Sequence, residues 1–142
     1  MNIAVRYCSR SGNTKAAAEA IAEALGVTAL SVDDPGAVPE EKVDLLFLGG
    51  ALYAYGIDDR LKTFITALSP ENVGKAALFS TSRLSKHALD VMRKALRAKG
   101  ILLLRQQTKS WFSNVQLPEP LSSLGLRLRI PIPASFCLLA EQ

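Results

Sequence analysis

The sequence predicts an α/β fold in which helices cover both faces of a doubly wound parallel sheet. Short apolar segments alternate with segments of helical period as far as residue 104, which is the pattern of repeated strand–helix units. The segment "VDLLFLGG" (43–50) is almost entirely apolar, as expected of a central parallel strand covered on both faces. A length of 142 residues fits a single domain with its own core.

The amino-terminal elements follow from the spacing of apolar residues and from glycine and proline. The segment 2–7 ("NIAVRY") is predicted to be the first strand, and 14–25 has one apolar helical face that ends before Gly26. The segment 27–32 is predicted to be the second strand. Because 33–42 contains two prolines and a glycine, we expect the next crossover helix to be very short or missing.

The later elements repeat the same alternation. After the third strand, Asp58 or Asp59 is predicted to cap a helix whose apolar residues recur at i, i+3, i+4 and i+7. The segment 76–81 is predicted to be the fourth strand. A longer helix follows, with Ser85 as its predicted cap, and 101–104 ("ILLL") is the fifth strand.

The composition favours a folded domain without a membrane-spanning or nucleic-acid-binding part. Apolar residues make up 49% and charged residues 21%, unlike a disordered chain. The net charge is +4, but the 17 Lys and Arg are scattered and form no basic stripe for nucleic acid. The longest uncharged run, 45–57, is too short to span a bilayer. Because Cys8 and Cys137 match neither a CxxC nor a zinc pattern, we expect a protein of the reducing cytoplasm.

Three segments that follow predicted strands are expected to meet at one edge of the sheet. They are 8–14 after the first strand, 51–56 after the third and 80–83 after the fourth. In open parallel sheets, ligands bind beyond the carboxyl ends of the strands, at the point where the strand order reverses. These segments therefore form the candidate binding site.

The segment "CSRSGNTK" (8–15) has the features of an anion site at a helix start. A helix N-terminus offers backbone N–H groups and a partial positive charge. The side-chain donors in this segment are Ser9, Ser11, Asn13 and Thr14. Gly12 lets the backbone approach a ligand closely or take a positive φ. An ordinary strand–helix turn would need only one capping residue, so the four donors favour an anion site.

Four known anion-binding or phosphoryl motifs do not fit this segment. The P-loop pattern GxxxxGK[ST] and the dinucleotide pattern GxGxxG are both absent. A cysteine phosphatase would have an arginine six residues after Cys8, where this chain has Thr14. A phospho-acceptor receiver domain would have acids after the first and third strands, where this chain has "YC" and "GG".

The sequence resembles the flavodoxin family from residue 1 to about 104. The loop Ser9-Arg10-Ser11-Gly12-Asn13-Thr14 is similar to that family's phosphate loop, in which hydroxyl residues precede Gly-x-Thr. The stretch "LGGALYAYGIDDRLKTFI" resembles the family's second flavin loop and the helix that follows it. The resemblance implies a five-stranded flavodoxin-like sheet of order 2-1-3-4-5 and an FMN bound without a covalent bond.

The resemblance also implies a role for each segment of the site. The loop 9–14 would hold the 5′-phosphate, and Tyr53 or Tyr55 would lie against the isoalloxazine ring unless these tyrosines only pack the loop. Gly56 would allow a peptide rearrangement near the flavin N5. The implied cofactor-binding residues are Ser9, Arg10, Ser11, Gly12, Asn13, Thr14, Ala51, Leu52, Tyr53, Ala54, Tyr55, Gly56, Ser80, Thr81 and Ser82.

Two residues of the loop region have alternative interpretations. Arg10 either adds positive charge to the phosphate site or points to solvent. Cys8 has no second cysteine nearby in the sequence, so we expect a small packed residue rather than a redox thiol. No catalytic residue and no metal ligand is predicted.

The tail departs from the resemblance, and we therefore divide the chain into a domain at 1–112 and a tail at 113–142. Its four prolines and the alternation "LGLRLRIPIP" do not make a helix, so the family's last helix is expected to be missing or degenerate. The face of the sheet that this helix would cover needs another cover. We expect the tail to lie across it in extended form, or the protein to self-associate through it or be marginally stable.

The predicted function is electron transfer through FMN, with a reductase and an acceptor protein as partners. A small FMN-dependent oxidoreductase acting on a quinone or a porphyrinogen-like substrate is the alternative enzyme. No acid–base residue is convincingly placed for such an enzyme, which favours the carrier. The third interpretation is a degenerate domain that no longer binds flavin because its last helix is lost.

Overall fold

The computed structural model describes seven stretches of the chain, namely 2–50, 52–53, 56–80, 87–103, 115–116, 127–128 and 137–139. Its helices are α1 (Asn13–Leu25), α2 (Asp59–Ala67) and α3 (His87–Ala98). The main sheet contains β1 (Ile3–Tyr7), β2 (Ala29–Ser31), β3 (Val43–Gly49), β6 (Val73–Ser80), β7 (Leu102–Leu103) and β10 (Cys137–Leu139). Two short antiparallel ribbons pair β4 (Leu52–Tyr53) with β5 (Gly56–Ile57), and β8 (Val115–Gln116) with β9 (Arg127–Leu128).

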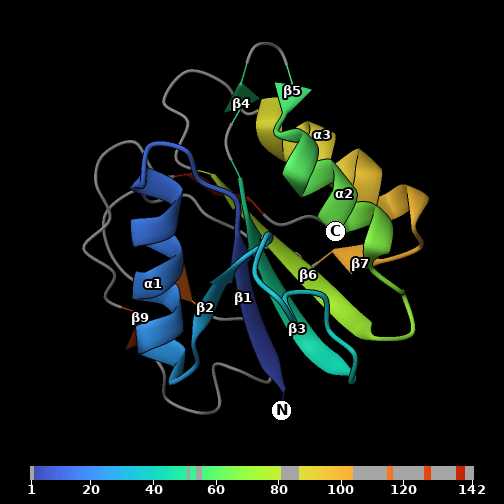
Figure 1. Ribbon diagram of the computed structural model, residues 1–142. Helices are drawn as coiled ribbons and strands as arrows, with labels where there is room; N and C mark the ends of the chain where they lie inside the picture. Colours follow the sequence, from blue (N-terminus) through green and yellow to red (C-terminus); the bar gives the residue numbers. More distant parts are fainter. Residues whose placement is uncertain are drawn as a thin grey trace.

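Five strands of the main sheet are parallel and lie in the order β2-β1-β3-β6-β7 (Figure 1). Numbered along the chain as parallel strands only, this is the predicted order 2-1-3-4-5, which is confirmed. The register pairs Tyr7 of β1 with Gly49 of β3, and Gly49 with Phe79 of β6. The carboxyl ends of these three strands therefore lie at the same level of the sheet.

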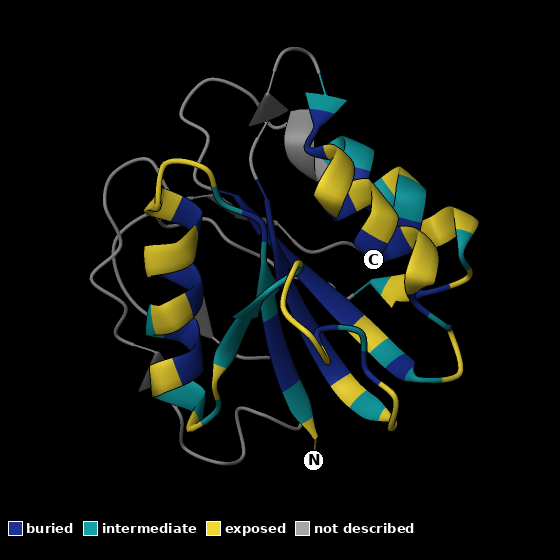
Figure 2. Cartoon of the chain, in the orientation of Figure 1, coloured by how far each residue is buried: buried dark blue, intermediate teal, exposed yellow. Residues whose placement is uncertain are grey.

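The helices cover the two faces of the sheet unequally. Figure 1 shows α1 on one face and α2 with α3 on the other. On β3, Leu45 and Phe47 belong to the core beneath α1, while Leu46 and Leu48 belong to the core beneath α2 and α3. All four are buried, so the near-continuous apolar run of β3 is explained by burial on both faces (Figure 2).

Local sequence sets where the helices begin and end. Helix α1 ends at Gly26, whose left-handed φ of 69° lets its N–H bond back into the last turn. Asp58 caps α2, because its side chain accepts a hydrogen bond from the backbone N–H of Arg60. The predicted cap of α3, Ser85, lies outside the described residues.

The crossover between β2 and β3 contains no helix, as the prolines predicted. A side chain from β1 holds it instead. Arg6 Nε donates to the carbonyl oxygen of Ala37 at 2.7 Å, and Ala37 itself is buried in the core beneath α2 and α3. Burial lowers the pKa of Arg6. In place of part of its water, the guanidinium has the backbone carbonyls of Ala37 and Val5 as hydrogen-bond acceptors.

The tail contributes a strand to the edge of the main sheet. Within the described residues, β7 pairs with β6 at Lys75 and Ala76, and β10 pairs antiparallel with the following part of β6, Leu78–Ser80. The sequence led us to expect an extended tail across a face of the sheet, whereas β10 lies in the plane of the sheet beside β6. In this position β10 pairs with backbone N–H and C=O groups of β6, which a tail lying across a face of the sheet would not do.

The face beneath α1 is buried within the single chain. Helix α1 packs against β1 and β2. On the same face of β6, farther along the sheet, Ala77 is 3% exposed and Phe79 is not exposed at all. These side chains are therefore removed from water without a second copy of the chain.

Candidate functional site

Backbone hydrogen bonds fix the starts of the loops at the carboxyl edge of the sheet. The N–H of Cys8 donates to the carbonyl of Gly49 at 2.9 Å, and the N–H of Gly50 donates to that of Phe79 at 3.2 Å. The loops that leave β1, β3 and β6 therefore start from adjacent positions, as the doubly wound topology predicted.

The loop 9–14 turns into α1, and no side chain caps the N-terminus of that helix. Gly12 occupies the N-cap position in the left-handed region, with φ 90° and ψ −9°. Its N–H donates to Ser9 Oγ at 3.0 Å, and its carbonyl accepts the N–H of Ala16 at 3.0 Å. Ser11 and Asn13 are exposed, whereas Thr14 is 1% exposed.

The N-termini of α1 and α2 differ in how they are capped. No side chain caps α1, and no acidic residue lies in its first turn. Helix α2, in contrast, is capped by Asp58 and has Asp59 in its first turn. Both helices begin at the same edge of the sheet, and the positive end of α1 has no carboxylate of its own in the first turn, whereas α2 has two.

The other predicted site residues are described to different degrees. Leu52 and Tyr53 form β4, which pairs with β5 through Tyr53 opposite Gly56 in an unpredicted small hairpin. Ser80 is the last residue of β6, is 1% exposed, and has Cys137 of β10 as its register partner. The remaining predicted residues lie outside the described stretches; they are Ala51, Ala54, Tyr55, Thr81 and Ser82.

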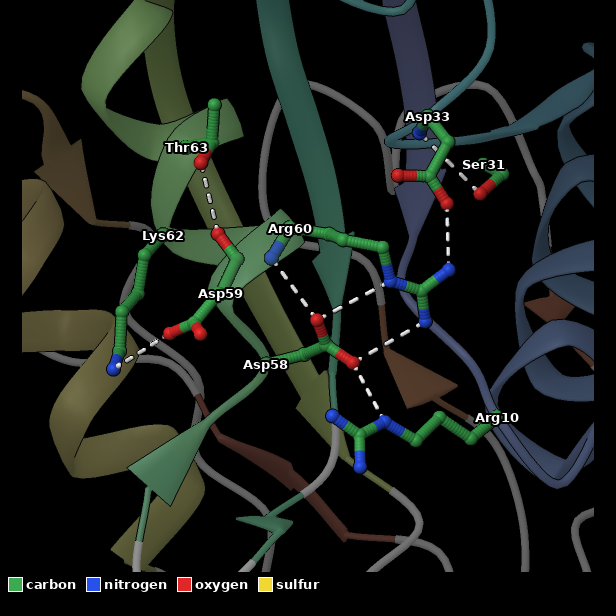
Figure 3. A network of polar contacts seen from close by, with 8 residues as sticks. All are labelled: Arg10, Ser31, Asp33, Asp58, Asp59, Arg60, Lys62 and Thr63. Carbon is green, nitrogen blue, oxygen red and sulfur yellow. Dashed lines mark hydrogen bonds and ion pairs between the residues drawn. The ribbon is translucent and has the colours of Figure 1, made fainter.

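A buried carboxylate beside the loop was missed by the sequence analysis. Asp58 is 5% exposed and lies between two guanidinium groups (Figure 3). Arg10 Nε donates to its Oδ2 at 2.7 Å, and Arg60 Nε donates to its Oδ1 at 3.2 Å. Arg60 Nη1 also donates to Asp33 Oδ2 at 2.6 Å. The structure gives Arg10 an arrangement that neither interpretation included, an ion pair with Asp58, and its contribution to a phosphate site stays a prediction.

The ion pairs among Arg10, Asp58, Arg60 and Asp33, here called the Asp58 network, change the pKa of Asp58 and of Arg60. The hydrogen bonds from the Arg60 side chain hold the pKa of Asp58 well below its usual range, against the effect of burial, with smaller contributions from the Arg60 backbone and from Arg10. The same carboxylate raises the pKa of Arg60. The Asp58 carboxyl is therefore ionised at neutral pH and has no proton to donate there.

Cys8 lies at the start of the loop as a buried free thiol. Burial raises its pKa, and the negative charge of Asp58 adds to the effect. Because the thiolate is the reactive form, the environment of Cys8 suppresses redox chemistry. It is packed in the core beneath α2 and α3, which agrees with the sequence-based expectation of a packed residue.

The comparison with protein families agrees with this geometry. Residues 4–110 match the profile of a family described as "Flavodoxin domain". The chain belongs to the flavodoxin family. No curated protein matches the sequence of this flavodoxin domain.

Solved structures share the fold of this flavodoxin domain at low sequence identity. A flavodoxin from the domain Archaea superposes with a TM-score of 0.59 at 23% identity, over 75% of this chain and 80% of that one. Oxidised Flavodoxin 2 from Bacillus cereus gives 0.56 at 18% identity, over 74% and 80% of the two chains. Rubredoxin oxygen:oxidoreductase from Desulfovibrio gigas gives 0.60 at 13% identity.

The match to the larger oxidoreductase is confined to one part of it. The superposition covers 71% of this flavodoxin domain but only 28% of the Desulfovibrio gigas protein. Another larger protein, the Flv1 flavodiiron core from Synechocystis sp. PCC6803, is likewise covered over 28% of its length, at 20% identity and a TM-score of 0.58. Within the described stretches of this chain, no helix has the length and apolar character needed to cross a bilayer.

Proposed function

We propose that this flavodoxin domain is an electron carrier that binds FMN at the carboxyl edge of its sheet. One observation carries the proposal. Helix α1 begins without a side-chain cap and without an acid, directly after a loop of hydroxyl residues that turns at the left-handed Gly12. A helix terminus of this kind, with neutral donors around it, suits a phosphate dianion.

The residues present fit the phosphate end of FMN. A side chain at Gly12 would meet no atom within 4 Å, so there is open space on that side of the loop. The exposed Ser11 and Asn13 are available as side-chain donors, and the backbone N–H groups at the start of α1 have no side-chain cap. Arg10, held by Asp58, would add its charge at the side of the loop.

The ring end of the proposed site would rest on the β4–β5 hairpin and on the end of β6. Tyr53 or Tyr55 would cover one side of the isoalloxazine ring, with Ala51, Leu52 and Ala54 around it and Gly56 near its N5. Ser80, Thr81 and Ser82 would face the other edge of the ring. FMN, when bound, supplies the electron transfer, and the residues of the protein bind it, orient it and exclude water.

The carrier is favoured over the FMN-dependent oxidoreductase because of the charged groups beside the site. Arg10, Asp58, Arg60 and Asp33 form ion pairs with one another. The pKa of Asp58 is far too low for proton transfer near neutral pH. Electron exchange with a partner protein needs no such group, whereas reduction of a quinone requires protons.

The proposed partners are a reductase and an acceptor protein of the cytoplasm. The net charge of +4 suits partners with an acidic docking face, and the rate of association should fall with added salt. Self-association through the face beneath α1 stays a prediction that light scattering can test. The burial of Ala77 and Phe79 within one chain weighs against it.

The experiment is a titration of the purified protein with FMN and with riboflavin, followed by absorbance and flavin fluorescence. We expect FMN to bind more tightly than riboflavin, because only FMN has the phosphate. Turnover with NADH and a quinone is then measured without a partner and with a flavoprotein reductase. If the protein reduces a quinone without a partner at an ordinary enzyme rate, on the order of ten per second, the proposal of an electron carrier is wrong. A protein that binds neither flavin would be a degenerate domain.

A further inference from the structure

The Asp58 network joins loops that lie far apart in the sequence. Asp58 follows the β4–β5 hairpin, Arg10 lies in the loop after β1, and Asp33 lies in the loop after β2. The Arg10–Asp58 contact spans 48 positions and the Arg60–Asp33 contact spans 27. Figure 3 shows the Asp58 carboxylate between the two arginine side chains.

Every acceptor position of the Asp58 carboxylate is used. Oδ1 accepts from the backbone N–H of Arg60 at 2.9 Å and from Arg60 Nε at 3.2 Å. Oδ2 accepts from Arg10 Nε at 2.7 Å and from Arg60 Nη2 at 3.2 Å. A carboxylate has about four such positions. A buried charge with four donors holds those donors in place, because losing any of them leaves a desolvated oxygen.

The loop after β1 gains a long-range anchor from this arrangement. Within the loop, the hydrogen bond from the N–H of Gly12 to Ser9 Oγ is local and spans three residues. The side chain of Arg10 is 56% exposed, but its Nε is joined by a short ion pair to the buried carboxylate of Asp58. The short distance and the buried partner make this contact stronger than an exposed ion pair.

We propose that Asp58 is a positioning residue that holds the loop 9–14, through Arg10, in the conformation that receives the phosphate of the flavin. This inference rests on the proposed function. Asp58 sits at the start of α2, directly after the hairpin expected beside the flavin ring. The same carboxylate therefore sets the position of the phosphate loop relative to the ring loop. Its loss should weaken binding of FMN and leave binding of riboflavin nearly unchanged.

The test uses two neighbouring Asp→Asn substitutions with different expected effects. Asp58→Asn keeps a good N-cap for α2 but removes the charge that holds Arg10. Asp59→Asn makes the same chemical change one residue later, on a side chain that is 95% exposed and 3.3 Å from Lys62. We expect the Kd for FMN to rise about tenfold in Asp58→Asn, with the Kd for riboflavin within about twofold of the wild-type value. Asp59→Asn should change neither.

A second readout needs no flavin. Hydrogen exchange of the loop amides 9–14 in the flavin-free protein should accelerate in Asp58→Asn, while the amides of β3 keep their protection. If Asp58→Asn does not fold, Arg10→Gln removes the same contact at an exposed position. Because this variant also removes the charge of Arg10, its deciding readout is faster hydrogen exchange of the loop amides 9–14 in the flavin-free protein, and unchanged exchange would overturn the inference. In the Arg10→Gln background, Asp58→Asn should have almost no further effect on the ratio of the two affinities.

The outcomes separate this inference from the proposed function. Wild-type protein that binds no flavin refutes the proposed function and, with it, the role of Asp58 toward a phosphate. Wild-type protein that prefers FMN, together with an Asp58→Asn variant that weakens both flavins equally or binds FMN more tightly, overturns this inference alone. Unchanged exchange of the loop amides in Asp58→Asn would also overturn it.

Discussion

The ring of Phe79 fills the space that a side chain on Gly49 would need. A Cβ at Gly49 would lie 2.2 Å from Phe79 Cε2 and 2.3 Å from Cζ. These two residues are register partners at the carboxyl ends of β3 and β6, and Phe79 is completely buried. The glycine is therefore required by the packing at the level of the sheet where the proposed flavin site begins.

Replacing Gly49 with alanine should destabilise the fold. The buried Phe79 ring cannot move away without disturbing the core beneath α1, so we expect a loss of about 1–3 kcal/mol in the free energy of unfolding. Urea unfolding followed by circular dichroism measures this. Gly56→Ala is the matched control, because a Cβ there meets no atom within 4 Å. Equal unfolding midpoints for the two variants would contradict the packing.

Replacing Gly12 with valine should abolish or strongly weaken FMN binding. The φ of +90° at Gly12 is unfavourable for a β-branched residue, so the loop and the start of α1 must change conformation. Flavin titration should show a Kd at least about tenfold higher. Gly100→Val introduces similar strain at φ +78° after α3, and Cys8→Ala removes the neighbouring thiol. Both of these variants should bind FMN like the wild type. If Gly12→Val also binds FMN with the wild-type Kd, the assignment of 9–14 as the phosphate-binding loop is wrong.

The Asp58 network should make stability depend on pH in the acid range. The pKa of Asp58 is lower in the folded chain than its unfolded value of about 4. Its contribution is therefore fully present above that value and is lost as the pH falls through the lower, folded pKa. Asp58→Asn should reduce the free energy of unfolding by about 1–3 kcal/mol at pH 7, and the difference should shrink below pH 4. Urea midpoints measured from pH 7 to 3 that stay equally far apart would count against this assignment.

The register of β10 can be tested with a disulfide. Ser80 and Cys137 are directly opposite in an antiparallel pair, where Cα separations of about 4.5–5.5 Å suit a disulfide. Mild oxidation of Ser80→Cys should link the two positions and stabilise the chain by about 2–4 kcal/mol. Peptide mapping identifies the bond, and the same substitution in a Cys137→Ser background is the control. A link to Cys8, or no link at all, would show that the register is different.

The order of elements could be predicted because apolar spacing reports burial directly. Alternating strands and helices, with β3 apolar on both faces, left few arrangements other than a doubly wound sheet. The start of β6 was predicted too late, at residue 76 instead of Val73. Gly74 resembled a turn residue, but it lies in β6, where the neighbouring backbone comes so close that a Cβ would be 2.8 Å from the carbonyl oxygen of Asp44.

The candidate site could be predicted in part. The open N-terminus of α1 follows from residues that are adjacent in the sequence, so its signal is local. The pairing of Arg10 with Asp58 has no local signal, because it depends on β1 and β3 being neighbours and on their ends lying level. The sequence left the cap of α2 open between Asp58 and Asp59, and the structure assigns it to Asp58, which is buried and also pairs with Arg10.

The place of β10 in the chain has a consequence for folding during synthesis. All five parallel strands have been made once Leu103 has been added, but the carboxyl half of β6 finds its antiparallel neighbour only at Cys137–Leu139. At about 5–20 residues per second, translation of the intervening segment takes roughly two to seven seconds. For that time, Leu78–Ser80 lacks the β10 partner and offers backbone groups to any extended segment nearby. An extended apolar segment of another chain would offer the same kind of backbone pairing, so early pairing with a foreign segment is the expected cost of placing this strand late in the sequence.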